Sequence, residues 1–138
     1  MDVMLMDKDP AAIKKSVEFM SIPSFLPCIE EDSLLSKDVA KERLTTNESD
    51  EIKSRVSSTT EMSSSTLSSL DFVIEAVSEN PSLKATIFKQ LATECSSHAT
   101  LATNTSSIGI TRIASAAAGA QDRVIGMHFM VFTSRTVY

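Results

Sequence analysis

Residues 72–91 read FVIEAVSENPSLKATIFKQL, and this stretch decides the fold class. Its first six residues are apolar apart from one glutamate, which is typical of a buried strand. Asn80 and Pro81 then signal a helix start: a side-chain oxygen at the cap, followed by a residue whose missing N–H costs nothing there. Apolar residues continue at helical spacing from Leu83 to Leu91. The stretch therefore predicts a strand followed by a helix.

The same alternation extends in both directions along the chain. Further on, the sequence predicts a strand over residues 99–103, an alanine-rich helix over 110–118 and a strand over 124–127. Near the N-terminus, the apolar residues 3–6 predict a strand, and Asp9 with Pro10 repeats the helix-start signal for a helix through residue 20. Strands that alternate with helices predict an α/β fold with a doubly wound parallel sheet.

The middle of the chain is less regular. Two prolines make residues 21–32 irregular, and a second helix is expected over residues 37–44. Serine and threonine dominate residues 54–69, which predicts a loop with one short strand near residues 55–58.

The composition is that of an ordinary globular protein. The chain has 138 residues, enough for one domain, with 42% hydrophobic and 22% charged residues. Its net charge is −5 and its basic residues do not cluster, which argues against nucleic acid and membrane surfaces as partners. No apolar run approaches the roughly 20 residues that span a bilayer.

The chain ends and the cysteines bear on location. The first residues lack the basic start of a signal peptide, and the last three differ from a peroxisomal Ser-Lys-Leu ending. Cys28 and Cys95 lie far apart and form no metal-ligand or redox pair, so we expect free thiols in a reducing compartment. The expectation is an intracellular, soluble protein without a metal site, with peroxisome, mitochondrial matrix and cytosol left open.

Three motifs in the second half carry a resemblance. They are FVIEAVSE at residues 72–79, LATNTSS at 101–107 and RVIGMHF at 123–129. By their order and spacing, residues 71–130 resemble the NAD-binding domain of the 3-hydroxyacyl-CoA dehydrogenase family, which includes 3-hydroxybutyryl-CoA dehydrogenases. Residues 2–19 resemble that family's second strand and its helix, so the resemblance covers a little over half of the chain. Residues 22–69 resemble the family only loosely.

The resemblance implies a fold and a reaction. In that family a Rossmann domain holds NAD, and a separate helical domain completes the substrate cleft and forms the dimer. Its members oxidise the 3-hydroxyl group of an acyl-CoA to a ketone and pass hydride to nicotinamide, as in fatty-acid β-oxidation. The resemblance thus implies an oxidoreductase with NAD as cofactor and an acyl-CoA as substrate.

His128 is the first candidate catalytic residue. Removing hydride from a carbinol carbon requires a base for the hydroxyl proton, and imidazole has a suitable pKa near 6.5. His128 directly follows a predicted strand, where open α/β sheets place ligands. Within Gly-Met-His-Phe the resemblance assigns it the family's catalytic role. The alternative is a histidine that makes a structural hydrogen bond at a strand end.

Two polar residues follow the strand of residues 99–103. The resemblance implies that Ser106 hydrogen-bonds the substrate oxygen, as a catalytic and substrate-binding residue, whereas the alternative is a cap for the helix that follows. The resemblance also implies that the Asn104 amide reaches the nicotinamide ribose, whereas the alternative is a turn-forming asparagine.

Further residues match cofactor-binding positions of the family. Asp7 ends the first predicted strand, where an acid accepts hydrogen bonds from the adenosine ribose and disfavours the 2′-phosphate of NADP. Ala76, Glu79 and Lys84 match residues near the nicotinamide ribose. The alternatives are a solvated loop acid for Asp7 and solvated helix charges for Glu79 and Lys84.

The chain also departs from the family pattern. Its three glycines form no Gly-x-Gly-x-x-Gly loop of the kind that cradles pyrophosphate. Val131 stands where the family has asparagine, and the glutamate that pairs with the family's histidine is not found. We therefore expect an incomplete Rossmann sheet without its first strand and glycine loop, over residues 1–130 with an irregular insert at about 21–69. An unrelated tail would follow at residues 131–138, with no helical domain.

Two functions remain open at this point. One is the dehydrogenase reaction, with little or no turnover by this chain alone unless another chain supplies the missing parts. The other is a non-catalytic fragment that binds nucleotide weakly or pairs with a full-length relative.

Overall fold

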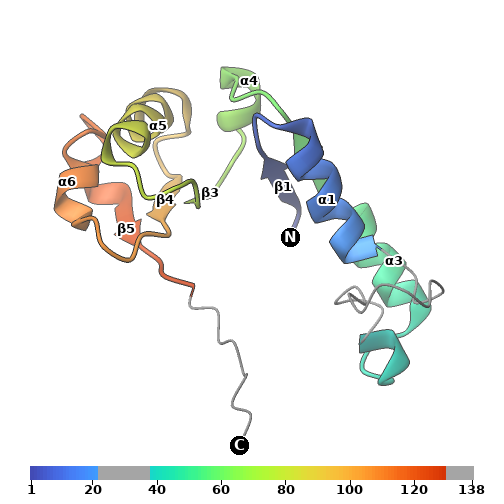
Figure 1. Ribbon diagram of the computed structural model, residues 1–138. Coiled ribbons are helices and arrows are strands. Elements are labelled where there is room, and N and C mark those ends of the chain that lie inside the picture. The colour runs from blue at the N-terminus through green and yellow to red at the C-terminus, as the bar shows by residue number, and fades with distance from the viewer. Residues whose placement is uncertain (22–37, 130–138) are drawn as a thin grey trace, which may run out of the picture. The chain divides into compact units, whose positions relative to one another are not determined.

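The computed structural model describes residues 1–21 and 38–129, and the chain divides into two compact units, Met1–Met62 and Ser63–Tyr138 (Figure 1). Each unit holds a parallel sheet, ordered β1-β2 in the first and β3-β4-β5 in the second. The predicted α/β class with parallel strands is confirmed. None of the helices in the described part of the chain has the length and apolar character that crossing a bilayer requires.

The described part of the first unit combines strands with helices. Its elements are β1 (Val3–Met6), α1 (Pro10–Ser21), α3 (Thr46–Ser54) and β2 (Val56–Thr59). β1 pairs in parallel with β2, so that Val3 lies opposite Val56. The helix start predicted at Asp9 is present, because the Ala11 N–H donates to Asp9 Oδ1 at 2.9 Å.

The middle of the chain is more regular than its composition suggests. Helix α3 was not expected, although its start carries a capping box: Thr45 Oγ1 accepts from the Glu48 N–H, and Glu48 Oε2 accepts from the Thr45 N–H. The helix expected over residues 37–44 is present only at residues 38–40, and a turn and bend follow. The short strand expected near residues 55–58 is present as β2. The irregular segment expected at residues 21–32 lies almost entirely outside the described residues.

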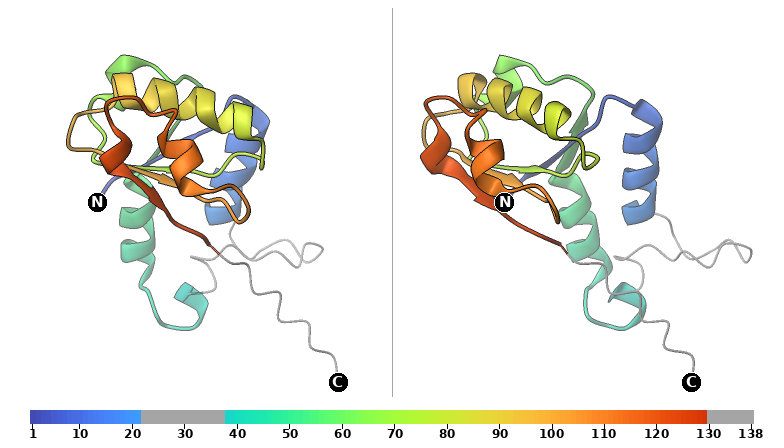
Figure 2. Two further views of the ribbon diagram at one scale, coloured as in Figure 1. Left: turned by 90° about the vertical axis from the view of Figure 1, so that its left-hand side faces the viewer. Right: turned by 60° about the vertical axis from the view of Figure 1, so that its left-hand side comes forward.

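The second unit alternates strands and helices. Its elements are α4 (Ser64–Leu67), β3 (Phe72–Glu75), α5 (Pro81–Glu94), β4 (Thr100–Thr103), α6 (Ile110–Ala114), the 3-10 helix η1 (Gln121–Arg123) and β5 (Val124–Gly126). β4 lies between β3 and β5, and α5 and α6 make the two crossovers on the same side of this sheet (Figure 2).

The core of the second unit lies between the sheet and these helices. Leu101 and Thr103 from β4 are fully buried, as is Phe88 from α5. On the other face, Phe72 and Ile74 of β3 remain 45% and 46% exposed. Because successive strand residues point to opposite faces, Leu101 and Thr103 lie on the packed face, whereas the side chains of β3 on the other face remain partly exposed.

The end of helix α6 differs from the prediction. Helix α6 stops at Ala114 instead of residue 118, and the chain continues in tighter turns, with the Ala117 N–H donating to the Ala114 carbonyl. Gly119 then adopts a φ of 85°, a conformation that favours glycine and reverses the chain. Alanine content alone therefore overestimated the length of this helix.

The order of the strands agrees with an incomplete doubly wound sheet. A complete sheet of this type is ordered 3-2-1-4-5-6. Leaving out its first strand gives one group of two strands and one of three, each in the order observed here for β1-β2 and β3-β4-β5. The expected missing strand thus accounts for two sheets instead of one.

A buried ion pair joins β3 to α5. Lys84 Nζ donates to Glu75 Oε1 at 2.8 Å, to Glu75 Oε2 at 3.0 Å and to the Val77 carbonyl at 3.2 Å. The side chains of Lys84 and Glu75 are only 0% and 2% exposed. Thr103 Oγ1 also donates to Glu75 Oε2, at 2.7 Å, so the same carboxylate is bonded to β4. This network fixes the end of β3 against its neighbours.

Replacing Lys84 by methionine should lower the free energy of unfolding by about 3–5 kcal/mol, because the Glu75 carboxylate would stay buried without its cation. Urea denaturation followed by circular dichroism measures the loss. Lys89→Met is the matched control, since Lys89 is exposed on the same helix, and it should change stability by no more than about 0.5 kcal/mol. Equal effects of the two substitutions would show that the ion pair does not hold the unit together.

Candidate active site

Polar side chains gather where the strands of the second unit end. Ala76 follows β3, Asn104 follows β4, and His128 comes two residues after β5. Because all three strands run in parallel, their carboxyl ends meet at one edge of the sheet, the edge at which open α/β sheets bind ligands. Ala76 is exposed at this edge, and so are Glu79 and Ser106.

Glu79 binds the loop that follows β4. Its carboxylate accepts hydrogen bonds from the Ser106 N–H at 2.6 Å, from Thr105 Oγ1 at 2.8 and 2.9 Å, and from Ser106 Oγ at 3.1 Å. The Ser106 N–H and the Thr105 hydroxyl group are the main causes that lower the pKa of Glu79 to about 2, with a smaller contribution from the positive charge of Lys84. At neutral pH Glu79 is therefore a charged acceptor that orders this loop.

Ser106 is not the cap of the following helix. Helix α6 begins at Ile110 with Gly109 at its N-cap position, and no side chain bonds there. Instead, Thr105 Oγ1 accepts from the Ile108 N–H at 3.1 Å. Thr105 was not among the predicted site residues. The Ser106 hydroxyl donates its proton to Glu79, so its lone pairs are what it offers to a ligand.

Lys84 differs from both sequence-based interpretations. Its ammonium has three N–H donors, and three acceptor atoms within the unit engage them. The side chain is 0% exposed and lies 3.9 Å from Glu79. This burial supports neither a direct contact with a cofactor nor a solvated helix charge. Its partner Glu75 was also overlooked, although a single acid inside an apolar strand is a recognisable signal.

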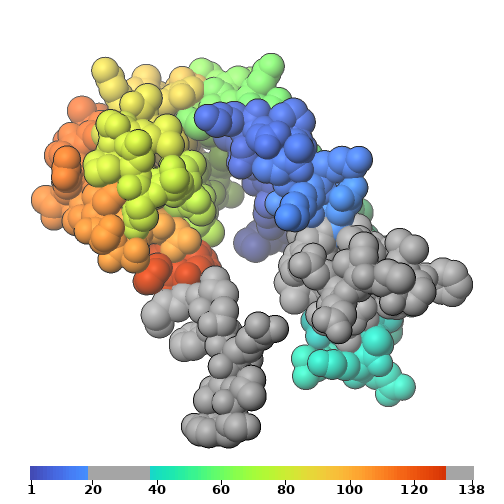
Figure 3. Space-filling view, in the orientation of Figure 1, coloured from blue at the N-terminus to red at the C-terminus, as the bar shows by residue number. Residues whose placement is uncertain are grey.

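His128 is exposed and lies two residues after β5. Figure 3 shows the last described residues of the second unit, in red, at its surface. The residues on either side of it are anchored: the Met127 N–H donates to the Thr103 carbonyl at 3.0 Å, and the Phe129 N–H donates to Asn104 Oδ1 at 3.0 Å. Among the described residues the imidazole has neither a hydrogen bond nor an acidic partner, so the structural alternative for this histidine gains no support there. The tail that contains Val131 lies outside the described residues.

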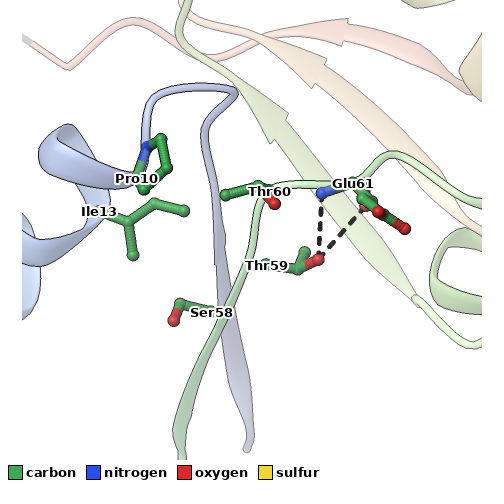
Figure 4. A pocket seen from close by; sticks show the side chains of 6 residues that line it. All are labelled: Pro10, Ile13, Ser58, Thr59, Thr60 and Glu61. Carbon is green, nitrogen blue, oxygen red and sulfur yellow. Dashed lines mark hydrogen bonds between the residues drawn. The ribbon is translucent and has the colours of Figure 1, made fainter.

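Asp7 lies in the first unit, directly after β1. It is exposed, and its Oδ1 accepts from the Asp9 N–H at 2.9 Å. Close to it, where β2 ends and α1 begins, is an open cavity of about 380 Å³. Pro10 and Ile13 form one wall and face Thr60 across the cavity (Figure 4).

The residues present fit a dinucleotide only in part. Asp7 is exposed directly after β1, a position from which a carboxylate can accept from a hydroxyl group, and polar side chains follow the carboxyl ends of β3-β4-β5. A pyrophosphate requires close backbone approach at a glycine-rich loop. The 138 residues contain three glycines, none of them in that pattern. No step can therefore be assigned to this chain at the phosphates.

Comparison with known proteins identifies the family. The model of the family described as "3-hydroxyacyl-CoA dehydrogenase, NAD binding domain" matches residues 1–132, including the middle of the chain. A 3-hydroxybutyryl-CoA dehydrogenase of Clostridioides difficile is 38% identical over 128 residues, which are 93% of this chain and 41% of that protein. The alpha subunit of the fatty acid oxidation complex of Shewanella amazonensis is 38% identical over 96 residues, 70% of this chain and 13% of that protein.

Solved structures agree with this result. The (S)-3-hydroxybutyryl-CoA dehydrogenase of Ralstonia eutropha superposes with a TM-score of 0.76 at 34% identity, over 94% of this chain and 41% of that one. The 3-hydroxybutyryl-CoA dehydrogenase of Escherichia coli gives a TM-score of 0.75 at 31% identity, over 93% of this chain and 24% of that one. The chain thus spans less than half the length of these relatives.

The carboxyl group of Glu79 should titrate with a pKa of about 2 instead of 4.5. Because the folded state lowers this pKa, the stabilisation is fully present above about pH 4.5 and is lost as the pH falls towards 2. Carbon-13 NMR of the side-chain carboxyl groups measures the midpoint. Thr105→Val removes a donor and should move the midpoint towards 4.5.

Thr93→Val is the control for this titration. The Thr93 hydroxyl donates only to the Lys89 carbonyl within α5, so its loss should leave the Glu79 midpoint unchanged. A midpoint near 4.5 in the unmodified chain would mean that Glu79 does not hold the loop of residues 105 and 106.

Proposed function

The chain belongs to the 3-hydroxyacyl-CoA dehydrogenase family through its NAD-binding domain, and on this premise we propose that its residues serve the NAD-dependent oxidation of the 3-hydroxyl group of an acyl-CoA. The observation that carries the proposal is the exposed imidazole of His128 at the carboxyl edge of β3-β4-β5, with anchored residues on both sides. The relatives' names point to short acyl chains, such as 3-hydroxybutyryl-CoA, as the substrate class.

The proposed role of His128 is that of proton acceptor. Bound NAD would supply the acceptor for the hydride that leaves the carbon bearing the hydroxyl group. The hydroxyl proton passes to the free imidazole nitrogen of His128, and a carbonyl group forms. General bases of this kind contribute about 10²–10⁴-fold to the rate. An exposed ring without a partner among the described residues can approach a substrate, but no carboxylate there stabilises its charged form.

The other site residues have supporting roles in this proposal. The Ser106 hydroxyl group donates its hydrogen bond to Glu79, so its oxygen accepts the hydrogen bond of the substrate hydroxyl group. Asp7 accepts from the adenosine ribose, and its negative charge selects NAD over NADP. Ala76, exposed at the end of β3, and Asn104 border the nicotinamide end of the same edge. Lys84 contributes indirectly: its ammonium donates to the Val77 carbonyl and so fixes the loop that carries Glu79.

The proposal has a limit for these 138 residues by themselves. Residues 1–130 are proposed as part of an NAD-binding domain, and they lack a glycine loop for the pyrophosphate. In the relatives, more than half of the length lies outside the matched region. We therefore expect little or no turnover of acetoacetyl-CoA with NADH by the 138-residue polypeptide, and activity only when another segment or chain supplies these parts.

A chimera tests whether the residues are competent. Residues 1–129 would replace the segment that they match in the Clostridioides difficile relative, to which the identity is 38%. The chimera should oxidise NADH with acetoacetyl-CoA, and His128→Ala should lower kcat about 10²–10⁴-fold because the proton acceptor is lost. Absorbance of the nicotinamide band measures the rate.

His98→Ala is the matched control in the same chimera. His98 is the other histidine of the chain, is exposed and bonds Ser96, so its loss should leave kcat unchanged. Equal rates for the two histidine variants would remove His128 from the mechanism. A folded chimera that binds NADH without turnover would contradict the proposed function itself.

A further inference from the structure

The hydrogen bonds between β4 and β5 continue beyond the strands. Their last pair in register is Thr103 with Gly126. The Met127 N–H still donates to the Thr103 carbonyl. One residue beyond His128, the acceptor for the Phe129 N–H is a side chain, Asn104 Oδ1, at 3.0 Å. A side-chain amide thus takes over where the backbone ladder has ended.

Asn104 is itself held firmly. Its N–H donates to the Glu75 carbonyl at 2.7 Å. On either side, the Thr103 hydroxyl donates to the Glu75 carboxylate and the Thr105 hydroxyl donates to Glu79. Asn104, which supplies the acceptor for the Phe129 N–H, therefore belongs to a segment whose three residues are all hydrogen-bonded to Glu75 or Glu79.

This arrangement brackets His128. With the N–H groups before and after it both bonded, the backbone dihedral angles of His128 are restricted although the residue lies past the end of its strand. A base that must meet a hydroxyl proton within hydrogen-bonding distance requires such restriction.

We propose that Asn104 is a positioning residue, whose side-chain oxygen fixes the backbone around His128 and so aims the imidazole, an inference that rests on the proposed function for the role of His128. This role differs from a direct contact with the nicotinamide ribose. It uses Oδ1 of the amide, whereas a ribose contact would use the Nδ2 donors that remain. The two roles separate on substitution, because aspartate keeps the acceptor oxygen and loses both donors.

The first test uses the complete 138-residue chain, labelled with nitrogen-15, and needs no activity. Amide hydrogen exchange at Phe129 should become about 2- to 10-fold faster in Asn104→Ala, as expected for the loss of one hydrogen bond. Backbone order parameters at His128 and Phe129 should fall, while the exchange of Leu101 in the core stays the same. Asn104→Asp should restore both quantities.

Ser107→Ala is the matched control. Ser107 is exposed on the same loop, and its substitution should leave exchange at Phe129 unchanged. Unaltered exchange in Asn104→Ala, or a failure of Asn104→Asp to restore it, would overturn the inference whatever the outcome for activity.

The second test measures kinetics in the chimera. Asn104→Ala should lower kcat about 10- to 100-fold, because a misplaced base loses alignment, while KM for NADH stays constant, and Asn104→Asp should recover kcat. A raised KM in both variants would assign Asn104 to the ribose and overturn the positioning role. An inactive chimera with Asn104 in place would instead count against the proposed function, with the exchange experiment still deciding the inference.

Discussion

The ion pair between Lys84 and Glu75 is the interaction on which the candidate site depends. It is buried within the second unit and connects β3 to α5, and through Thr103 it reaches β4. Charges in such a place are stabilising only when nearly every donor and acceptor is satisfied. Here the ammonium has three acceptors and the carboxylate also receives the Val77 N–H at 2.6 Å. The end of β3 is consequently held in one conformation.

Side-chain contacts connect this ion pair to the loops that follow β4 and β5. Glu79 lies within 3.9 Å of the buried ammonium and binds the loop after β4. Asn104 is tied to β3 through the Glu75 carbonyl and in turn binds the segment after β5. Regular pairing ends at the strand termini. Beyond them, the Asn104 and Met127 N–H groups still bond backbone carbonyls, and the side chains of Glu79 and Asn104 supply the further hydrogen bonds that order this edge. The pKa of about 2 keeps Glu79 charged and therefore accepting throughout the physiological range.

Local signals in the sequence predicted the helices and strands well, but they did not predict which side chains pair between different elements. Asn80 with Pro81 and Asp9 with Pro10 mark helix starts because the capping groups are adjacent in sequence. The burial of Lys84 was not predicted, because helical spacing shows which face a residue occupies and does not show that it pairs with Glu75, a strand residue nine positions earlier. The helix cap that was the alternative for Ser106 is not observed, because the Ser106 N–H and hydroxyl bond Glu79 and the Thr105 hydroxyl accepts from the Ile108 N–H.

None of the three glycines of this sequence is available for a phosphate-binding loop. Each has another explanation in the structure: Gly119 makes a turn with φ of 85°, Gly109 precedes α6, and Gly126 lies in β5, where a Cβ would come within 2.9 Å of Ile110 Cδ1. A pyrophosphate cradle is a property of backbone conformation, which no arrangement of Asp7 or His128 side chains can replace. The proposed roles of Asp7 and His128 are therefore independent of any contact with the phosphates. For this reason the arrangement of the side chains at the carboxyl edge of β3-β4-β5 does not depend on a phosphate-binding loop.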